Sequence, residues 1–334
     1  MAARGAERYP SLFTPGAFRD TVLIGIHWTE NEHFATAESL FTELAAEYPQ
    51  SPIGPLFTAA AIHGEMLDTE SPARAIEFRR WLDEAISEAE RWSVAEPSNG
   101  EPEFVLGAAF GYDAVYESHW GGWFAALKRG LSAKGHFARA LELDTTIVDA
   151  YLGLGTYNYW KAVKTDFINW LPVVPDNRAK GLAQLQRVIA DGVLSRNAAR
   201  ASLCYALINE EDYQTALAHA DTLATLLPDA KSPLWIMAEA SMGLYRWHDA
   251  VAHYDSIASR IKRNDPGNYY NLIECTAQRA RALYEAGEYR DALAACHEGL
   301  GYPAPDETLK RQKRTLDQLR ALQRRLRNLT QPTR

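Results

Sequence analysis

The sequence predicts an all-α protein built as an array of helix hairpins, and three observations support this fold class. The 334-residue chain is longer than one hydrophobic core usually serves, so it should divide into two domains or into repeated units that pack on their neighbours. Ala, Leu, Glu and Arg are abundant, with 47% hydrophobic and 23% charged residues, which is typical of amphipathic helices. One pattern of small and aromatic residues also recurs along the chain, which favours repeated units over two unrelated domains.

The recurring pattern is a small residue, then an aromatic residue nine positions later, then an alanine three positions after that. A small side chain where two helices cross lets their axes approach closely, and the large aromatic fills the space between successive pairs. Four segments follow this pattern without a gap, and we expect their residues to be the repeat-packing positions: Gly25, Phe34 and Ala37; Cys204, Tyr213 and Ala216; Ala238, Trp247 and Ala250; and Ala280, Tyr289 and Ala292.

This pattern resembles the tetratricopeptide repeat (TPR), a unit of two antiparallel helices. Ala216 and Ala250, which hold equivalent positions, are 34 residues apart, and Pro49 closes the first unit as the repeat's terminal proline does. The resemblance implies a right-handed α-solenoid. We therefore expect a non-catalytic interaction scaffold that binds a protein or peptide partner through the concave groove of the solenoid and the aromatic inserts described below.

Two neighbouring units are longer than the others. Their small residues, Gly107 with Ala133 and Gly155 with Gly181, are 26 positions apart, whereas 12 positions separate the small residues of the regular units. Each of these two units therefore carries about 14 extra residues between its helices, and we expect these inserts near 116–130 and 162–176.

A further helix pair and a terminal segment complete the array. The pair lies between the first unit and the long units, and Ser71 with Pro72 marks the start of its second helix. The sequence therefore predicts seven helix pairs at 17–304, after an N-terminal extension at 1–16 and before a basic amphipathic helix and tail at 305–334. The terminal helix should begin near Asp306 and cap the array; the alternative is a helix that binds a membrane surface or an acidic partner.

The inserts hold a concentration of aromatic side chains, which either pack into a local hydrophobic core or anchor a partner. Because their repeats are adjacent, we expect the inserts to lie side by side. The candidate partner-binding residues are Trp120, Trp123, Tyr157, Tyr159, Trp160, Lys161, Lys164, Trp170 and Arg178.

No catalytic or metal-binding motif accompanies these residues. Gly153 and Gly155 form a G-x-G, but the third glycine and the preceding strand of a dinucleotide fold are missing. The three cysteines show no metal-ligand spacing, and His27 and His33 fall at a predicted turn where solvated polar residues are common. The sequence therefore predicts no enzyme, cofactor or metal site.

Net charge restricts the partners. The chain carries −8 overall, but 309–334 carry +8, which leaves −16 on the first 308 residues. This predicts a basic or neutral protein or peptide ligand and argues against nucleic acid on the main body. Self-assembly and attachment to a membrane surface are the alternatives, and the oligomeric state is left open.

The expected cellular compartment is inferred from the length of the apolar segments. No stretch reaches 18 apolar residues and the first residues lack the apolar core of a leader, so the default expectation is cytoplasmic; a preceding leader would make the protein periplasmic or envelope-associated.

A second resemblance is local, covering about 35 residues. It is similar to a family of bacterial TPR proteins and, more distantly, to the inclusion-body-clearance family of TPR proteins at the mitochondrial outer membrane. It implies a structural motif without catalytic residues, and bacterial relatives often look exported or lipid-anchored. The matching positions are Gly153, Gly155, Tyr157, Tyr159, Pro172, Pro175, Asp176, Arg178, Gly181 and Leu182.

Overall fold

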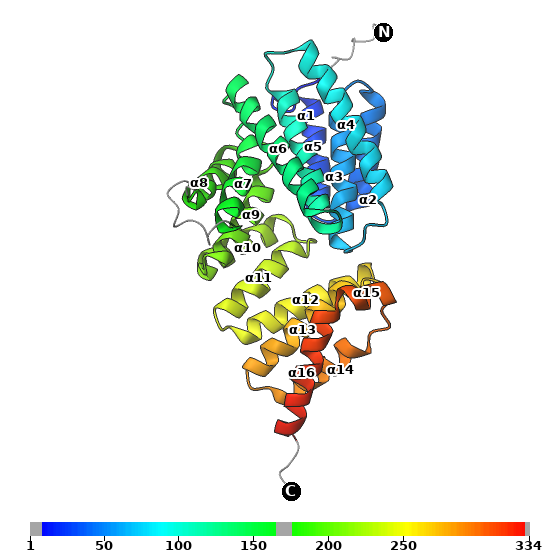
Figure 1. Cartoon of the computed structure of the whole chain (residues 1–334), viewed down its shortest axis with the longest axis vertical. Coiled ribbons are helices and arrows are strands. Elements are labelled where there is room, and N and C mark those ends of the chain that lie inside the picture. The colour runs from blue at the N-terminus through cyan, green and yellow to red at the C-terminus, as the bar shows by residue number, and fades with distance from the viewer. Residues whose placement is uncertain (1–8, 165–175, 331–334) are drawn as a thin grey trace. The chain divides into compact units, whose positions relative to one another are not determined.

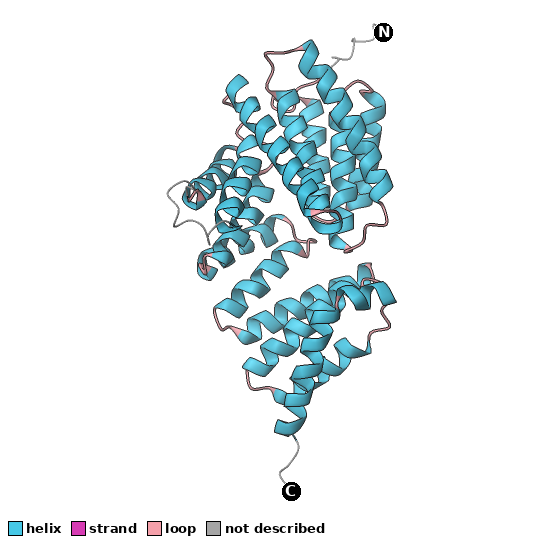
Figure 2. Ribbon diagram, in the orientation of Figure 1, coloured by secondary structure: helices cyan, strands magenta, loops and turns pink. Residues whose placement is uncertain are grey.

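The computed structural model describes residues 9–164 and 176–330, and all regular structure within these ranges is helical (Figure 2). The predicted all-α fold is therefore confirmed, and so is the count of seven helix pairs followed by a C-terminal helical segment. The pairs, labelled in Figure 1, are α1 (Ala17–Glu30) and α2 (Phe34–Glu47), α3 (Ile53–Asp68) and α4 (Ala75–Ala95), α5 (Glu101–Trp120) and α6 (Trp123–Leu143), α7 (Ala150–Lys164) and α8 (Arg178–Asp191), α9 (Arg196–Asn209) and α10 (Tyr213–Leu226), α11 (Ser232–Gly243) and α12 (Trp247–Asn264), and α13 (Tyr269–Glu285) and α14 (Tyr289–Gly301), and they are followed by α15 (Asp306–Arg311) and α16 (Lys313–Thr330).

The chain forms two compact units, Met1–Ala206 and Leu207–Arg334. In unit 1 each helix from α1 to α7 packs on the helix that follows it, and one continuous hydrophobic core runs from Leu12 to Leu194. In unit 2 the helices from α10 to α14 pack in the same sequential way, with buried residues between each pair. Both units are thus stacks of TPR-like helix hairpins.

One backbone turn is repeated between the helices of the regular pairs. Glu32, Glu211, Tyr245 and Gly287 all have left-handed backbones, with φ of 66°, 60°, 58° and 82°. Each lies two residues before the aromatic residue that begins the second helix. A left-handed residue reverses the chain in a short turn, so this shared conformation explains the constant nine-residue spacing between the small and the aromatic residue.

The small residues lie where helices touch. A Cβ added to Gly25 would lie 2.3 Å from the ring of Phe41, so the aromatic ring of α2 occupies the space next to α1. Gly155 and Gly181 bring the backbones of α7 and α8 together, since a Cβ on Gly181 would lie 2.7 Å from the Gly155 carbonyl oxygen. Side chains larger than hydrogen would separate these helices.

The aromatic residues contact the following hairpin. A Cβ on Gly64 of α3 would lie 2.8 Å from the ring of Phe34, and a Cβ on Gly243 of α11 would lie 2.4 Å from the ring of Tyr213. Both aromatics precede their glycine by 30 residues. The repeated spacing therefore reflects one contact that joins successive hairpins.

The first long unit has longer helices rather than a looped insert. α5 and α6 have 20 and 21 residues, whereas α1 and α2 have 14 each, and only Gly121 and Gly122 separate α5 from α6. The extra residues at 116–130 therefore extend both helices. Most of the second expected insert, at 162–176, lies outside the described residues.

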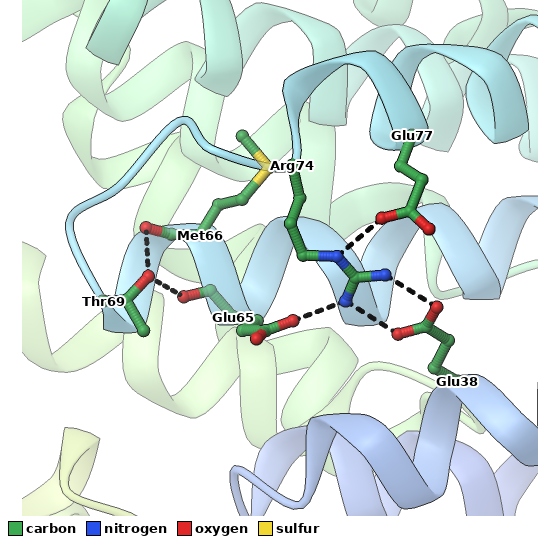
Figure 3. A network of polar contacts seen from close by, with 6 residues as sticks. All are labelled: Glu38, Glu65, Met66, Thr69, Arg74 and Glu77. Atoms are coloured by element: carbon green, nitrogen blue, oxygen red, sulfur yellow. Dashed lines mark hydrogen bonds and ion pairs between the residues drawn. The ribbon is translucent and has the colours of Figure 1, made fainter. Parts of the chain in front are cut away.

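A polar network fixes α2, α3 and α4 to one another (Figure 3). The Arg74 guanidinium, at the start of α4, donates to both carboxylate oxygens of Glu38 at 2.8 Å, to Glu65 at 2.6 Å and to Glu77 at 2.7 Å. Glu38 is on α2 and Glu65 on α3, so one side chain links three helices. The hydrogen bonds to Glu38 and Glu77 raise the Arg74 pKa further, and the guanidinium stays charged.

The described part of the N-terminal extension packs on unit 1. Leu12 is completely buried, its backbone N–H donates to Glu101 at 2.8 Å, and Tyr9 stacks on Trp92 with ring centroids 5.2 Å apart.

The C-terminal segment covers α13 and α14. Leu316, Leu319 and Leu326 of α16 are buried in the core of this region. A helix begins at Asp306 as predicted, but it is interrupted at Gln312, whose side-chain amide is buried and donates to the Tyr270 carbonyl oxygen at 3.1 Å. The segment therefore caps the last hairpin of unit 2.

We predict that Gly181→Ala destabilises unit 1 by about 1–3 kcal/mol, because the added methyl group meets backbone atoms of α7 that cannot rotate away. Gly135→Ala is the matched control: Gly135 is exposed inside α6 with no atom near its Cβ position, so alanine should stabilise the helix by about 0.5–1 kcal/mol. Urea unfolding followed by circular dichroism measures both changes. Equal effects of the two substitutions would contradict this account of the α7–α8 contact.

We further predict that Arg74→Met lowers the unfolding midpoint, because Glu38, Glu65 and Glu77 then lose their shared cation and repel one another. The expected cost is about 1–2 kcal/mol. Adding Glu38→Gln to Arg74→Met should recover part of this loss by removing one charge. A double variant no more stable than Arg74→Met would show that repulsion is not the cause.

Candidate functional site

The start of α6 presents a row of exposed apolar side chains. Trp123 is 64% exposed, Phe124 81%, Leu127 42% and Leu131 49%. Positions 123, 127 and 131 lie on one face of the helix because they are spaced by four residues. We call these four residues the hairpin-tip strip. Large apolar side chains grouped on a surface indicate an interaction site more strongly than the same residues scattered singly.

Ion pairs hold this hairpin in place. Asp113 of α5 is almost fully buried; it forms an ion pair with Arg129 of α6 at 2.7 Å and accepts a hydrogen bond from Arg79 of α4 at 3.2 Å. Burial raises the pKa of Asp113, and the charges of Arg129 and Arg79 oppose this shift. Arg79 also pairs with Glu117 and lies 4.4 Å from the ring centroid of Tyr116. The base of the hairpin-tip strip is therefore attached to both preceding helices.

Trp120 belongs to the interior rather than to this surface. Its ring lies 5.6 Å from Tyr116 and 6.5 Å from the buried His63, and its indole N–H is buried without a hydrogen-bond partner in the described residues. His63 itself stacks on Phe78 at 5.1 Å, and burial lowers its pKa to about 4. These rings form a local hydrophobic core, which was one of the two alternatives for the aromatic insert.

The face of α7 next to α6 is basic and aromatic. The Tyr157 ring has the Lys134 ammonium of α6 at 5.1 Å and the Lys161 ammonium at 6.0 Å from its centroid. Lys134 continues the face marked by Leu127 and Leu131, so this group borders the end of the hairpin-tip strip. We call Lys134, Tyr157 and Lys161 the Tyr157 corner. Lys164 is exposed one turn after Lys161, at the end of α7.

The remaining candidate residues do not join this surface. Tyr159 is completely buried and its hydroxyl donates to the Ala206 carbonyl oxygen at 2.9 Å, so its assignment as a partner-binding residue is corrected to a packing residue of unit 1. Trp160 is half-buried against the Tyr159 ring. Arg178 pairs with Asp176 at 2.8 Å and thereby lowers the pKa of that carboxyl group. Trp170 lies outside the described residues.

The predicted site residues did not include Leu127, Leu131 and Lys134. The signal was present, because Ala133, Phe137 and Ala140 mark the buried face of α6 and these three residues fall away from it.

The inner row of unit 1 is lined by the first helix of each hairpin, since α1 contacts α3, α3 contacts α5 and α5 contacts α7. This row is bridged by polar side chains. The Asn197 amide of α9 donates to the Glu30 carboxylate of α1 at 2.9 Å, across 167 positions of sequence. Glu30 retains partial exposure, yet protein atoms surround its carboxylate and burial raises its pKa to about 7. Tyr112 is deeply enclosed nearby, and burial raises its pKa to about 12.

The described residues contain no group of three His, Cys, Asp or Glu side chains placed to hold a metal ion. His27 contacts the Asn31 amide at 3.1 Å, and His33 packs on Trp28. The three cysteines are buried and free, and burial raises the pKa of Cys204 to about 12 and that of Cys296 to about 11. These thiols are protonated at neutral pH and are poor nucleophiles.

Among the helices of the described ranges, none combines the length and the apolar character that crossing a membrane requires.

No family model matches the chain, and no curated protein matches it. Among solved structures it is similar to PilW, described as a widely conserved type IV pilus biogenesis factor, with 16% sequence identity and a TM-score of 0.47 over 73% of this chain and 96% of that one.

We predict that Glu30 makes the stability of unit 1 depend on pH. Its folded-state pKa of about 7 lies above the unfolded value of 4.5, so its contribution is full below pH 4.5 and is lost as the pH rises through 7. The loss amounts to at most about 3 kcal/mol. Thermal melting between pH 4.5 and 8 should show a flatter profile for Glu30→Gln. Glu43→Gln, at an exposed position of α2, is the control and should retain the parental profile.

Proposed function

We propose that the protein is a non-catalytic interaction module, and that unit 1 binds a segment of a partner protein on the hairpin-tip strip. The observation that carries the proposal is the row of four exposed large apolar side chains on a helix held by ion pairs to the buried Asp113. Such a rigid surface loses little conformational freedom when a partner covers it.

The spacing of the strip favours a helical ligand. Side chains at positions 123, 127 and 131 form a ridge about 12 Å long, which matches two turns of an amphipathic helix laid alongside. A partner helix with apolar residues at three- and four-residue intervals would bury Leu127 at the centre of the contact and Trp123 at one end of it. Buried Trp residues commonly contribute a large share of the binding energy.

The local charge favours an acidic group at one end of this ligand. Lys134 and Lys161 flank Tyr157 next to the end of the strip, and Lys164 follows on α7. The net charge of the chain led to the expectation of a basic or neutral ligand. Docked groups interact mainly with the charges within a few ångströms, so we give more weight to these lysines than to the net charge.

The concave TPR groove, the other expected binding surface, is supported less well in unit 1. Glu30 and Asn197 join α1 to α9, and along the same row of helices His63 is buried and Tyr112 is half-buried. A ligand lying there would need to break the Glu30–Asn197 hydrogen bond. The outward strip needs no such rearrangement.

We predict that Trp123→Ala with Leu127→Ala weakens partner binding by about 30-fold or more, because the largest side chain of the strip and the one at its centre are both lost. Ile76→Ala with Val94→Ala is the matched control, since these α4 residues are 89% and 84% exposed but belong to no strip. A photo-crosslinking residue at Leu131 would first identify the partner in the native host, and titration calorimetry with the purified partner would then measure affinity. Equal affinity of parent and strip variant would refute the proposed site.

Two further readouts separate the alternatives. Light scattering that shows a dimer in the parent and a monomer in the strip variant would assign the strip to self-assembly instead. Flotation of the parent with phospholipid vesicles, lost in the strip variant, would assign it to a membrane surface.

A further inference from the structure

A second surface, in unit 2 and independent of the hairpin-tip strip, is strongly basic. Where α15 meets α16, a shallow concavity of about 680 Å³ is lined by Lys310, Arg311, Lys313, Arg314, Asp317 and Gln318. Four cations and one carboxylate therefore share one hollow. We call it the basic cradle.

The basic surface extends along α16 beyond the cradle. Arg324 and Arg325 are exposed and follow Lys313 and Arg314 by 11 residues, which is three helical turns, so they lie on the same face. From Lys313 to Arg325 the basic face of α16 is about 18 Å long. The result is a track of positive charge that begins in the hollow.

Two arginines of this track are held in place by aromatic rings. The Arg311 guanidinium lies 4.5 Å from the ring centroid of Tyr270, and the Arg325 guanidinium lies 4.8 Å from that of Tyr284. Both tyrosines belong to α13, on which α16 packs. Stacking on a ring restricts the orientation of a planar guanidinium, whose fork of N–H groups matches the two oxygens of a carboxylate.

We infer that the basic cradle and its track bind a short acidic segment of a partner protein. The track matches about six residues of extended chain at 3.3 Å per residue. Carboxylates of Asp and Glu along such a segment can pair with successive arginines.

The structure disfavours a membrane as the occupant. An amphipathic helix binds lipid through its apolar face, and here Leu316, Leu319 and Leu326 of that face are buried against α13 and α14. Leu309 and Leu329, at the two ends of the segment, are exposed, and Leu322 is half-buried.

Nucleic acid is disfavoured for two reasons. Residues 306–330 contain no aromatic side chain on which a base could stack. The rest of unit 2, residues 207–308, carries a net charge of −8 and Asp317 lies within the cradle itself, so a long polyphosphate running past the track meets repulsion. A segment no longer than the track avoids that repulsion.

Fluorescence anisotropy with a labelled decapeptide of alternating Glu and Asp tests this inference on the full chain. We expect saturable binding that weakens as salt is added, and a loss of affinity of at least about tenfold in Arg311→Glu with Arg314→Glu. Arg311→Gln with Arg314→Gln should give a smaller loss in the same direction, and circular dichroism establishes that both variants fold.

The control is Arg263→Glu with Arg290→Glu, which changes the net charge equally at exposed positions elsewhere in unit 2. This control should bind the peptide nearly as well as the parent. An equal loss in the control would mean that net charge alone governs binding, and unchanged binding in the cradle variants would place the peptide elsewhere; either result overturns the inference.

Three other outcomes would also overturn it. Tighter binding of a single-stranded oligonucleotide than of the peptide would assign the track to nucleic acid, and co-sedimentation with phosphatidylserine vesicles that the cradle variant abolishes would assign it to lipid. Self-association of the parent in sedimentation velocity, abolished in the cradle variant, would assign it to a second copy of the chain. Since all variants leave the hairpin-tip strip intact, failure here is distinguishable from failure of the proposed function.

Discussion

The approach of helix backbones at residues with small side chains is the constraint on which the rest of the structure depends. At Gly155 and Gly181 the absence of a Cβ lets α7 and α8 touch through backbone atoms, and at Gly107 and Gly153 the Phe137 ring fills the space that a side chain would occupy. The distance between the two helices of a hairpin in turn determines which residue of the next hairpin its aromatic side chain contacts. The 30-residue contacts of Phe34 with Gly64 and of Tyr213 with Gly243 follow from that spacing.

The candidate surface arises where helical length exceeds this repeat. The regular hairpin needs only one buried face on its second helix, and α6 supplies it with Ala133, Phe137 and Ala140. The additional turns of α6 extend the helix beyond the regular length, and no further helix covers their outer face. Their apolar residues therefore stay exposed, and the ion pairs of Asp113 replace the missing layer in holding the helix. One side of α6 therefore stabilises the hairpin, while its other side leaves the apolar side chains exposed.

Local pattern predicted the fold well because each hairpin depends on residues close to it in sequence. The small, aromatic and alanine positions predicted seven pairs and the capping segment, since every such position acts on the adjacent helix. The local sequence pattern predicted the candidate site less well than the fold. Whether Tyr159 faces solvent depends on Ala206, 47 residues away, and whether Tyr157 contacts Lys134 depends on the pairing of two long helices. The extension of α5 and α6 up to Gly121 and Gly122 was also not evident, because glycines equally suit a long loop.

The net charge of the chain predicts a basic or neutral ligand, whereas the lysines and arginines at the two proposed surfaces favour an acidic one. The distance over which each set of charges acts decides between these conclusions. The net negative charge of residues 1–308 acts on a ligand from a distance, where salt screens charges beyond about 8 Å at physiological ionic strength. The Tyr157 corner and the basic cradle act at contact distance, where screening is weaker. An acidic ligand should therefore approach slowly and dissociate slowly, because repulsion from the body affects the encounter while the lysines and arginines affect the bound state. Adding salt would then speed association while it weakens the final complex, a combination that a uniformly basic protein would not show.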